Sequence, residues 1–203
     1  MMRKISANLF ISLDGVIQDP ADWHFPYFNE EMGAAVTEQM TDTLLLGRET
    51  YDSFAGAWPE REAAGGEDAA FAKTIGDARK IVVSRQPLEF TWRNSELLRG
   101  ELTEAVAALK AEPGGPIGMS GSVSVVRRLL AAGLLDELHL LVHPIAVRKG
   151  DRLFDEGDDT IPLELVRSQV FTTGVLYLVY KPAGSAGEGS YDDAKTHLPQ
   201  DVG

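Results

Sequence analysis

At 203 residues, with 44% hydrophobic and 25% charged residues, the chain has the size and composition of one globular domain. It has no cysteine, which excludes disulfides, cysteine zinc sites and thiol catalysis, and it lacks an apolar run of membrane-spanning length, so a cytoplasmic protein without a membrane partner is predicted. The formal net charge of −12 argues against nucleic acid as a partner, because phosphate binding needs a basic surface.

The first half of the chain predicts strands that alternate with helices. Strands are expected at residues 4–13, 43–46 and 80–84, and helices at 29–40, 49–54 and 69–75. Asn29 is expected to cap the first helix, with Glu30 and Glu31 in its first turn. Two loops are expected, a stiff and partly apolar one after the first strand and an exposed one at residues 55–68.

The second half predicts more consecutive strands. Helices are expected at residues 101–111 and 123–132, and strands at 97–100, 117–119, 136–143, 146–147, 160–171 and 174–181. The last two are expected to form an antiparallel hairpin. This order predicts an α/β fold with a mostly parallel sheet and an antiparallel C-terminal edge hairpin over residues 1–182. Residues 183–203 are rich in Gly and Ser and predict a disordered tail.

Three features recur directly after predicted parallel strands, where ligands bind in such sheets. They are Gly47-Arg48, Ser84-Arg85 and Ser120-Gly121-Ser122, and the last opens a helix. A helix start lined by glycine suits a pyrophosphate, and two arginines with a serine suit an isolated phosphate. NADPH carries both groups, and its 2′-phosphate is absent from NADH. The alternative is three unrelated turns with solvated arginines.

Several motifs together resemble the dihydrofolate reductase superfamily, in particular its bacterial proteins related to the reductase domain of bifunctional riboflavin biosynthesis enzymes. They are SLDG (12–15), LGRETY (46–51), IVVSR (81–85), IGMSGS (117–122) and LLAAGLLDELHLLVHPIAVRKGDRLF (129–154). The resemblance implies a three-layer α/β/α fold around an eight-stranded sheet that binds NADPH.

The same resemblance implies the cofactor contacts. The residues expected to contact NADPH are Gly47, Arg48, Thr50, Ser84, Arg85, Ser120, Gly121 and Ser122. Asp14 and Gly15 are expected near the nicotinamide.

A reductase also needs a proton source and a surface for its substrate. Asp14, Glu30 and Glu31 are the candidate acids. The alternatives are that Asp14 is a turn residue and that Glu30 and Glu31 are first-turn acids favoured by the helix dipole. Trp23, Phe28 and Tyr51 are the candidate aromatic residues for stacking on a heterocycle. The alternative for Trp23 and Phe28 is a loop anchored to the core.

The histidines do not predict a metal site. His139 and His143 lie four residues apart in one strand, about 13 Å by strand rise, which is too far for a shared ion. His24 and His197 have no ligand-like neighbours.

The apolar residues on both faces of the last strand predict a homodimer at this sheet edge.

The most concrete hypothesis is an NADPH-dependent reductase of a small heterocycle. The resemblance points to a pteridine or to 5-amino-6-(5-phosphoribosylamino)uracil, an intermediate of riboflavin biosynthesis. Two alternatives remain open: a catalytically silent nucleotide-binding protein, and a flavin-type oxidoreductase.

Overall fold

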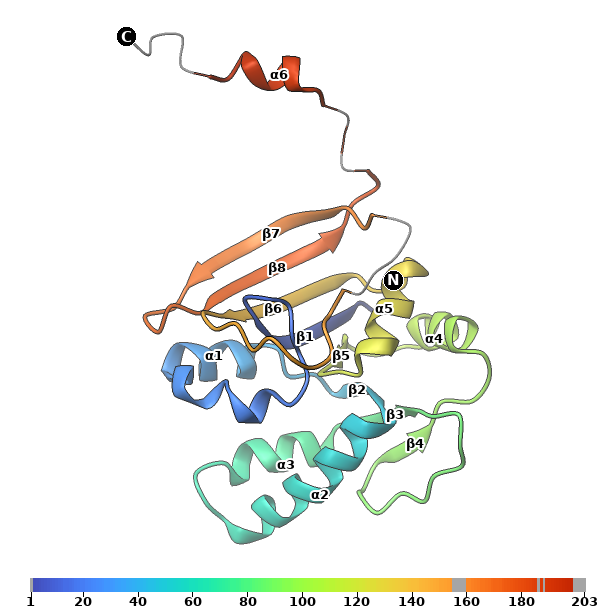
Figure 1. Cartoon of the computed structure of the whole chain (residues 1–203). Helices are drawn as coiled ribbons and strands as arrows, with labels where there is room; N and C mark the ends of the chain where they lie inside the picture. Colours follow the sequence, from blue (N-terminus) through green and yellow to red (C-terminus); the bar gives the residue numbers. More distant parts are fainter. Residues whose placement is uncertain (1, 155–159, 186, 188, 199–203) are drawn as a thin grey trace.

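A computed structural model describes residues 2–154, 160–185, 187 and 189–198 of the chain (Figure 1). Its strands are β1 (Ile5–Ser12), β2 (Thr43–Gly47), β3 (Arg79–Val83), β4 (Ser95–Leu97), β5 (Ile117–Met119), β6 (Glu137–His143), β7 (Leu163–Val170) and β8 (Leu176–Pro182). They form one sheet in the order β4-β3-β2-β5-β1-β6-β8-β7, in which β8 pairs antiparallel with both of its neighbours, β6 and β7, and the other pairs are parallel. The predicted mostly parallel sheet with an antiparallel edge hairpin is confirmed.

Helices cover both faces of this sheet. The helices that cover it are α1 (Glu30–Glu38), α2 (Arg48–Ala64), α3 (Ala69–Asp77), α4 (Leu102–Ala111) and α5 (Val123–Ala131), and a further helix, α6 (Tyr191–Lys195), lies in the tail. Two short 3-10 turns lie at Pro20–Asp22 and Phe25–Tyr27. One large core cluster joins α4 and α5 to one face of the sheet. Two smaller clusters pack α1, α2 and α3 on the other face. The result is the expected three-layer α/β/α arrangement.

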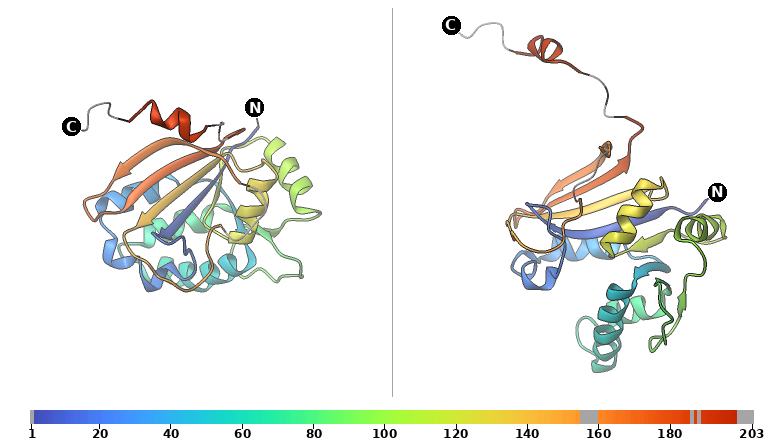
Figure 2. Two further views of the ribbon diagram at one scale, coloured as in Figure 1. Left: turned by 45° about the horizontal axis from the view of Figure 1, so that its top comes forward. Right: turned by 45° about the vertical axis from the view of Figure 1, so that its right-hand side comes forward.

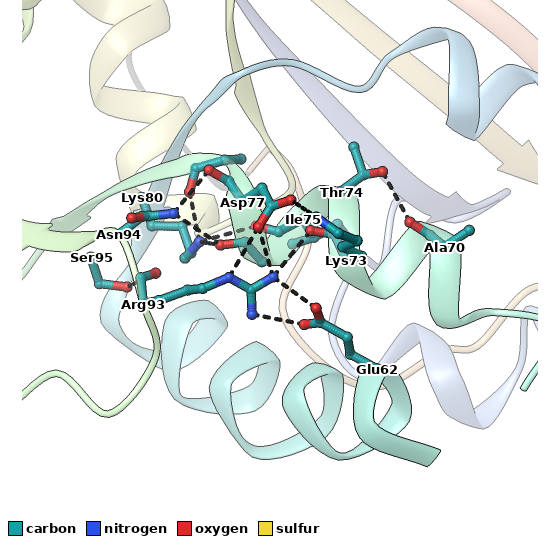
Figure 3. A network of polar contacts seen from close by, with 12 residues as sticks. Glu62, Ala70, Lys73, Thr74, Ile75, Asp77, Lys80, Arg93, Asn94 and Ser95 are labelled. Atoms are coloured by element: carbon teal, nitrogen blue, oxygen red, sulfur yellow. Dashed lines mark hydrogen bonds and ion pairs between the residues drawn. The ribbon is translucent and has the colours of Figure 1, made fainter. Parts of the chain in front are cut away.

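The helix α2 is much longer than the sequence predicts, since it continues through most of the expected loop at residues 55–68. Phe54 and Trp58 hold its middle in the core, where Trp58 packs on Phe71 of α3. Arg93 fastens its far end through two hydrogen bonds to Glu62, of 2.7 and 3.0 Å (Figure 3). These contacts come from distant segments, and they hold together a helix whose charged, proline-containing sequence favours a loop.

One further expectation needs correction. Residues 146–147 form no strand, because the segment after β6 is held by side-chain hydrogen bonds instead of a sheet partner. Within the predicted tail, α6 forms a short helix that Ser190 caps through a reciprocal pair of hydrogen bonds with Asp193. In Figure 2 the tail leaves the body beyond β8.

We expect deletion of residues 184–203 to leave the melting temperature and cofactor affinity unchanged. The largest apolar side chains of the described tail, Tyr191 and Leu198, are 74% and 57% exposed, so they contribute little packing. Calorimetry of the full and truncated chains checks this expectation. A melting temperature several degrees lower in the truncated chain would show that the tail docks on the body.

Candidate functional site

The carboxyl ends of the parallel strands meet at one edge of the sheet, and two predicted cofactor segments touch there. A Cβ added to Gly47 would lie 2.2 Å from the Cβ of Ser122, and one added to Gly121 would lie 2.9 Å from the hydroxyl of Thr50. Glycine is therefore required at both positions for the end of β2 and the turn after β5 to approach so closely. Gly121 also has a φ of 128°, a conformation that L side chains rarely adopt.

Two helices begin at this contact. Gly47 is the N-cap of α2 and Ser122 is the N-cap of α5. Gly47 has no side chain to cap α2, and the Ser122 side chain makes no capping hydrogen bond to α5. The first N–H groups of both helices and the positive ends of both helix dipoles are therefore available at one place. Such a convergence favours a group with several negative oxygens, as a diphosphate has.

Arg48, Ser84 and Arg85 surround the ends of β2 and β3. The guanidinium of Arg48 donates a 2.7 Å hydrogen bond to the side-chain oxygen of Gln86 and forms an exposed ion pair with Asp52 at 3.4 Å. The hydroxyl of Ser84 bonds the backbone of Gln86. Arg85 makes no hydrogen bond or ion pair with any residue that the structure describes. Because Gln86 bonds the Arg48 guanidinium and follows Arg85 in the chain, the start of α2 lies beside the turn after β3 that carries Arg85.

The sheet has an open edge beside this contact. β5 has only three residues and reaches β1 only along Ile5–Ala7, whereas β6 pairs with β1 along Ser6–Ser12. Among the strands of the described residues, β1 therefore has a neighbour on one side only from Asn8 onwards. Its backbone donors and acceptors on the other side lie beside the Ser120–Ser122 turn, where a flat polar ligand can pair with them.

Asp14 is held by the backbone rather than poised for proton transfer. Its carboxylate accepts hydrogen bonds from the Ser12 hydroxyl at 2.6 Å and from the N–H groups of Val147 and Arg148 at 2.9 and 2.8 Å. The Ser12 bond is the main cause that lowers the pKa of Asp14 to about 2. An acid so firmly ionised is a poor proton donor at neutral pH, so the structure favours a role in fixing the segment after β6. Gly15 follows with a φ of 85°, which fits the tight turn.

Glu31 is likewise engaged in structure. It accepts hydrogen bonds from the N–H and hydroxyl of Thr172, at 2.7 and 2.6 Å, and another from Asn29. The hydroxyl bond from Thr172 is the first cause that lowers its pKa. Glu31 therefore ties the start of α1 to the turn between β7 and β8, whereas its neighbour Glu30 is exposed.

The three candidate aromatic residues lie in different surroundings. Tyr51 is 2% exposed, and its hydroxyl accepts a hydrogen bond from the N–H of Trp92, so its ring belongs to the core and is not free for stacking. Trp23 is also buried, with its ring edge-on to His143 at 5.1 Å. Phe28 is exposed, next to His24.

Sequence reasoning missed the two buried histidines at this edge. His143 ends β6 and His24 follows the first loop, and their rings lie 6.0 Å apart among Phe10, Trp23 and Tyr27. The available signal was the density of aromatic residues in WHFPYF (23–28), which is unusual for a loop. Among the residues that the structure describes, no group of three or more histidine, aspartate or glutamate side chains is placed to hold a metal ion.

We expect the free energy of unfolding to decrease as the pH falls from about 6.5 towards 4. Burial lowers the pKa of His24 from 6.5 to about 4, so the unfolded chain binds this proton first. The stability that depends on neutral His24 is thus complete above pH 6.5 and is lost on acidification, on the order of 1–3 kcal/mol. Urea unfolding of the wild type and of His24→Phe across this range measures the difference. Parallel pH profiles for the two proteins would contradict it.

A hollow of about 540 Å³ lies at the opposite edge of the sheet, near the amino ends of β2, β3 and β4. Its lining residues are polar or charged: Asp42, Asp77, Arg79, Asn94, Ser95 and Glu96. The arginine is already paired with Glu96 and Glu112, so this hollow does not offer a free cation to an anionic cofactor.

No helix that the structure describes is long and apolar enough to cross a membrane.

The chain is similar to two uncharacterized proteins of Bacillus subtilis (strain 168). YyaP is 29% identical over 181 residues, which cover 88% of this chain and 94% of YyaP. YwjB is 25% identical over 179 residues, which cover 86% of this chain and 96% of YwjB.

Solved structures share the fold. A putative riboflavin biosynthesis protein from Shewanella sp. PV-4 has a TM-score of 0.68 at 21% identity, with 90% of this chain and 99% of that chain covered. Dihydrofolate reductase from Enterococcus faecalis, solved with NADP(H), has a TM-score of 0.58 at 19% identity, with the same coverage. The fold is therefore dihydrofolate reductase-like. The family model of the RibD C-terminal domain matches residues 3–177, and the chain belongs to this family.

Proposed function

We propose that the protein is an NADPH-dependent reductase that transfers hydride to a small heterocycle. Membership of the RibD C-terminal domain family supports a reductase-type function. The observation that carries the choice of cofactor is the contact of Gly47 with Ser122, where two uncapped helix starts converge. The diphosphate would lie on these N–H groups, and the nicotinamide along the open edge of β1 beyond Ala7. NADPH supplies the hydride when bound.

The arginines at the ends of β2 and β3 support NADPH over NADH. Arg48 is held by an uncharged glutamine and a solvent-exposed carboxylate, and Arg85 has no partner among the described residues. Both cations therefore remain available for the 2′-phosphate, although the chain as a whole carries a net charge of −12. The proposed substrate is a pteridine or an aminopyrimidine, and absorbance at 340 nm with NADPH and each candidate tests turnover. Tight NADPH binding without turnover of any candidate would instead support the silent nucleotide-binding protein.

We expect Arg48→Ala to weaken NADPH binding about tenfold to a hundredfold and to leave NADH binding nearly unchanged. A charge-assisted hydrogen bond to a phosphate contributes ~1.5–3 kcal/mol, and only NADPH carries the 2′-phosphate. Titration calorimetry with both cofactors measures the change. Arg61→Ala is the control, because Arg61 lies in the last turn of α2 and pairs with Asp68. Equal losses of NADPH and NADH binding would place Arg48 away from the 2′-phosphate.

We also propose that the protein forms a homodimer through β7 and β8. Leu165, Val170 and Leu176 are 50%, 70% and 36% exposed and come from these two edge strands. Val170 lies opposite Leu176 in the antiparallel pair, so both side chains share one face of the sheet. In Figure 1 β7 and β8 lie at the end of the sheet, away from α2, α3 and α4. A second copy would remove these side chains from water.

A further inference from the structure

His24 and His143 form the centre of an aromatic cluster that the proposed reductase chemistry has not used. We call it the histidine box, made of these two rings with Phe10, Trp23 and Tyr27. His143 lies opposite Ser12 in the pairing of β6 with β1, so the box stands at the carboxyl edge. Phe10 lies on β1 itself, and β6, which carries His143, is the next strand, about 4.8 Å from β1 on the side away from its open edge.

The surroundings of His143 determine which of its ring nitrogens carries the proton. Nδ1 lies 2.7 Å from the carbonyl oxygen of Leu141, and a carbonyl can only accept, so Nδ1 donates. In the neutral ring Nε2 is then an acceptor. The side chain is fully buried, and Nε2 has no hydrogen-bond partner in the described structure. Burial lowers the pKa of His143 and so favours the neutral ring, although hydrogen bonding to the carbonyls of Leu141 and Ile11 opposes the shift.

His24 is held by stacking rather than by hydrogen bonds. Its ring lies almost parallel to that of Phe10, with centroids 4.4 Å apart, and Phe25 packs against it at 4.2 Å. The residue is 6% exposed, and Nδ1 is buried with no partner among the described residues. Phe25 and Phe28, which both contact His24, are 59% and 49% exposed. Aromatic rings therefore also lie between the histidine box and the solvent.

Two buried nitrogens without partners in one cluster are unusual, because buried polar groups are normally hydrogen-bonded and an unmet bond has a free-energy cost. A ligand that donates to them removes that cost. The flat rings around them favour a planar partner. Asp14 and Glu31 do not compete to accept hydrogen bonds from such a ligand, since their carboxylates already accept hydrogen bonds from the protein.

We propose that Nε2 of His143 and Nδ1 of His24 are specificity-determining contacts that bind the N–H edge of a planar heterocyclic substrate. His143 offers an acceptor only, whereas His24 can adopt either tautomer and meet a donor or an acceptor. The box therefore selects a lactam or amino-substituted ring and rejects one whose N–H is alkylated. This inference rests on the proposed reductase function, which is the reason to call the heterocycle a substrate. Binding of the heterocycle itself does not require NADPH.

Equilibrium dialysis of the full chain without NADPH tests the inference, with pterin, 5-aminouracil and the N-methylated derivative of each as probes. We expect the wild type to bind at least one parent compound at least tenfold more tightly than its methylated derivative. His24→Phe keeps the stacked ring without its nitrogens, and His143→Asn keeps a donor near the Nδ1 position without Nε2. In both variants we expect the ratio to fall below about twofold.

His139→Gln is the matched control. This histidine lies on the same strand as His143, but its two nitrogens already have partners, Tyr177 at 2.8 Å and Glu137 at 3.2 Å. We expect it to retain the tenfold ratio. If His143→Asn does not fold, His24→Phe alone decides. An unchanged ratio in the folded variants, or no binding of either parent compound at millimolar concentration, would overturn the inference. NADPH binding measured separately would show whether the proposed function fails with it.

Discussion

Gly121→Val is expected to weaken NADPH binding at least a hundredfold and to lower the melting temperature by several degrees. A Cβ at this position would lie 2.9 Å from the Thr50 hydroxyl, and branching adds atoms towards the proposed diphosphate site. The backbone φ of 128° adds strain of about 1–3 kcal/mol in any L residue. Calorimetric titration and thermal unfolding measure the two effects.

Gly47→Ala separates the steric contact from the backbone strain, since Gly47 has an ordinary φ of −72°. Its new Cβ would meet the Cβ of Ser122 at 2.2 Å, so the turn after β5 must move away from β2. We expect the affinity for NADPH to fall here too. Gly56→Val, in the middle of α2 with open space around its Cβ, is the control for adding a side chain. Normal NADPH binding by Gly121→Val and Gly47→Ala would exclude this contact as the diphosphate site.

Val179→Glu is expected to prevent folding, whereas Val170→Glu is expected to give a soluble, folded monomer. Val179 is 5% exposed and belongs to the cluster that joins β8 to α1, with Met32 and Ala35. A carboxylate buried there without a partner costs several kcal/mol, which is a large part of the stability of a domain. Val170 is 70% exposed on the face that we propose for the dimer. A charge at this position is therefore expected to disturb association of the two subunits and to leave folding of each subunit intact.

Light scattering and circular dichroism of the two variants measure assembly and folding. Leu178→Glu is an intermediate case, because Leu178 is half-buried on the face opposite Val179 and lies next to the buried Leu140 in the pairing of β8 with β6. Glu164 on β7 offers a control, since its exposed carboxylate already pairs with Lys181. Glu164→Gln should leave the dimer intact. A wild-type mass of about 22 kDa in solution would contradict the dimer before any variant is made.

Much of the sheet could be predicted because its signals are local. The apolar run Leu44–Leu46 has a glycine directly after it, and an uninterrupted run of this kind is typical of a strand covered on both faces. Asn29 caps α1 as predicted, by accepting a hydrogen bond from the N–H of Met32. The close approach of Gly47 to Ser122 also follows from the expectation that parallel strands end at one edge.

The failures concern contacts between residues distant in sequence. Tyr51 follows the glycine turn as a site residue would, but Trp92, 41 residues later, bonds its hydroxyl inside the core. Asp14 looks like an available acid until the backbone of Val147 and Arg148 is placed beside it. His143 looks isolated in the sequence, and only the pairing of β6 with β1 brings it to His24 and the aromatic loop.

Calorimetric titration of the full chain with NADPH, and with NADH under the same conditions, tests the central claim most directly. The convergence of two helix starts with Arg48 and Arg85 predicts one NADPH bound per chain, with a dissociation constant on the order of 1–10 µM and NADH at least tenfold weaker. Absence of NADPH binding at about 1 mM, or equal affinity for the two cofactors, would contradict the account.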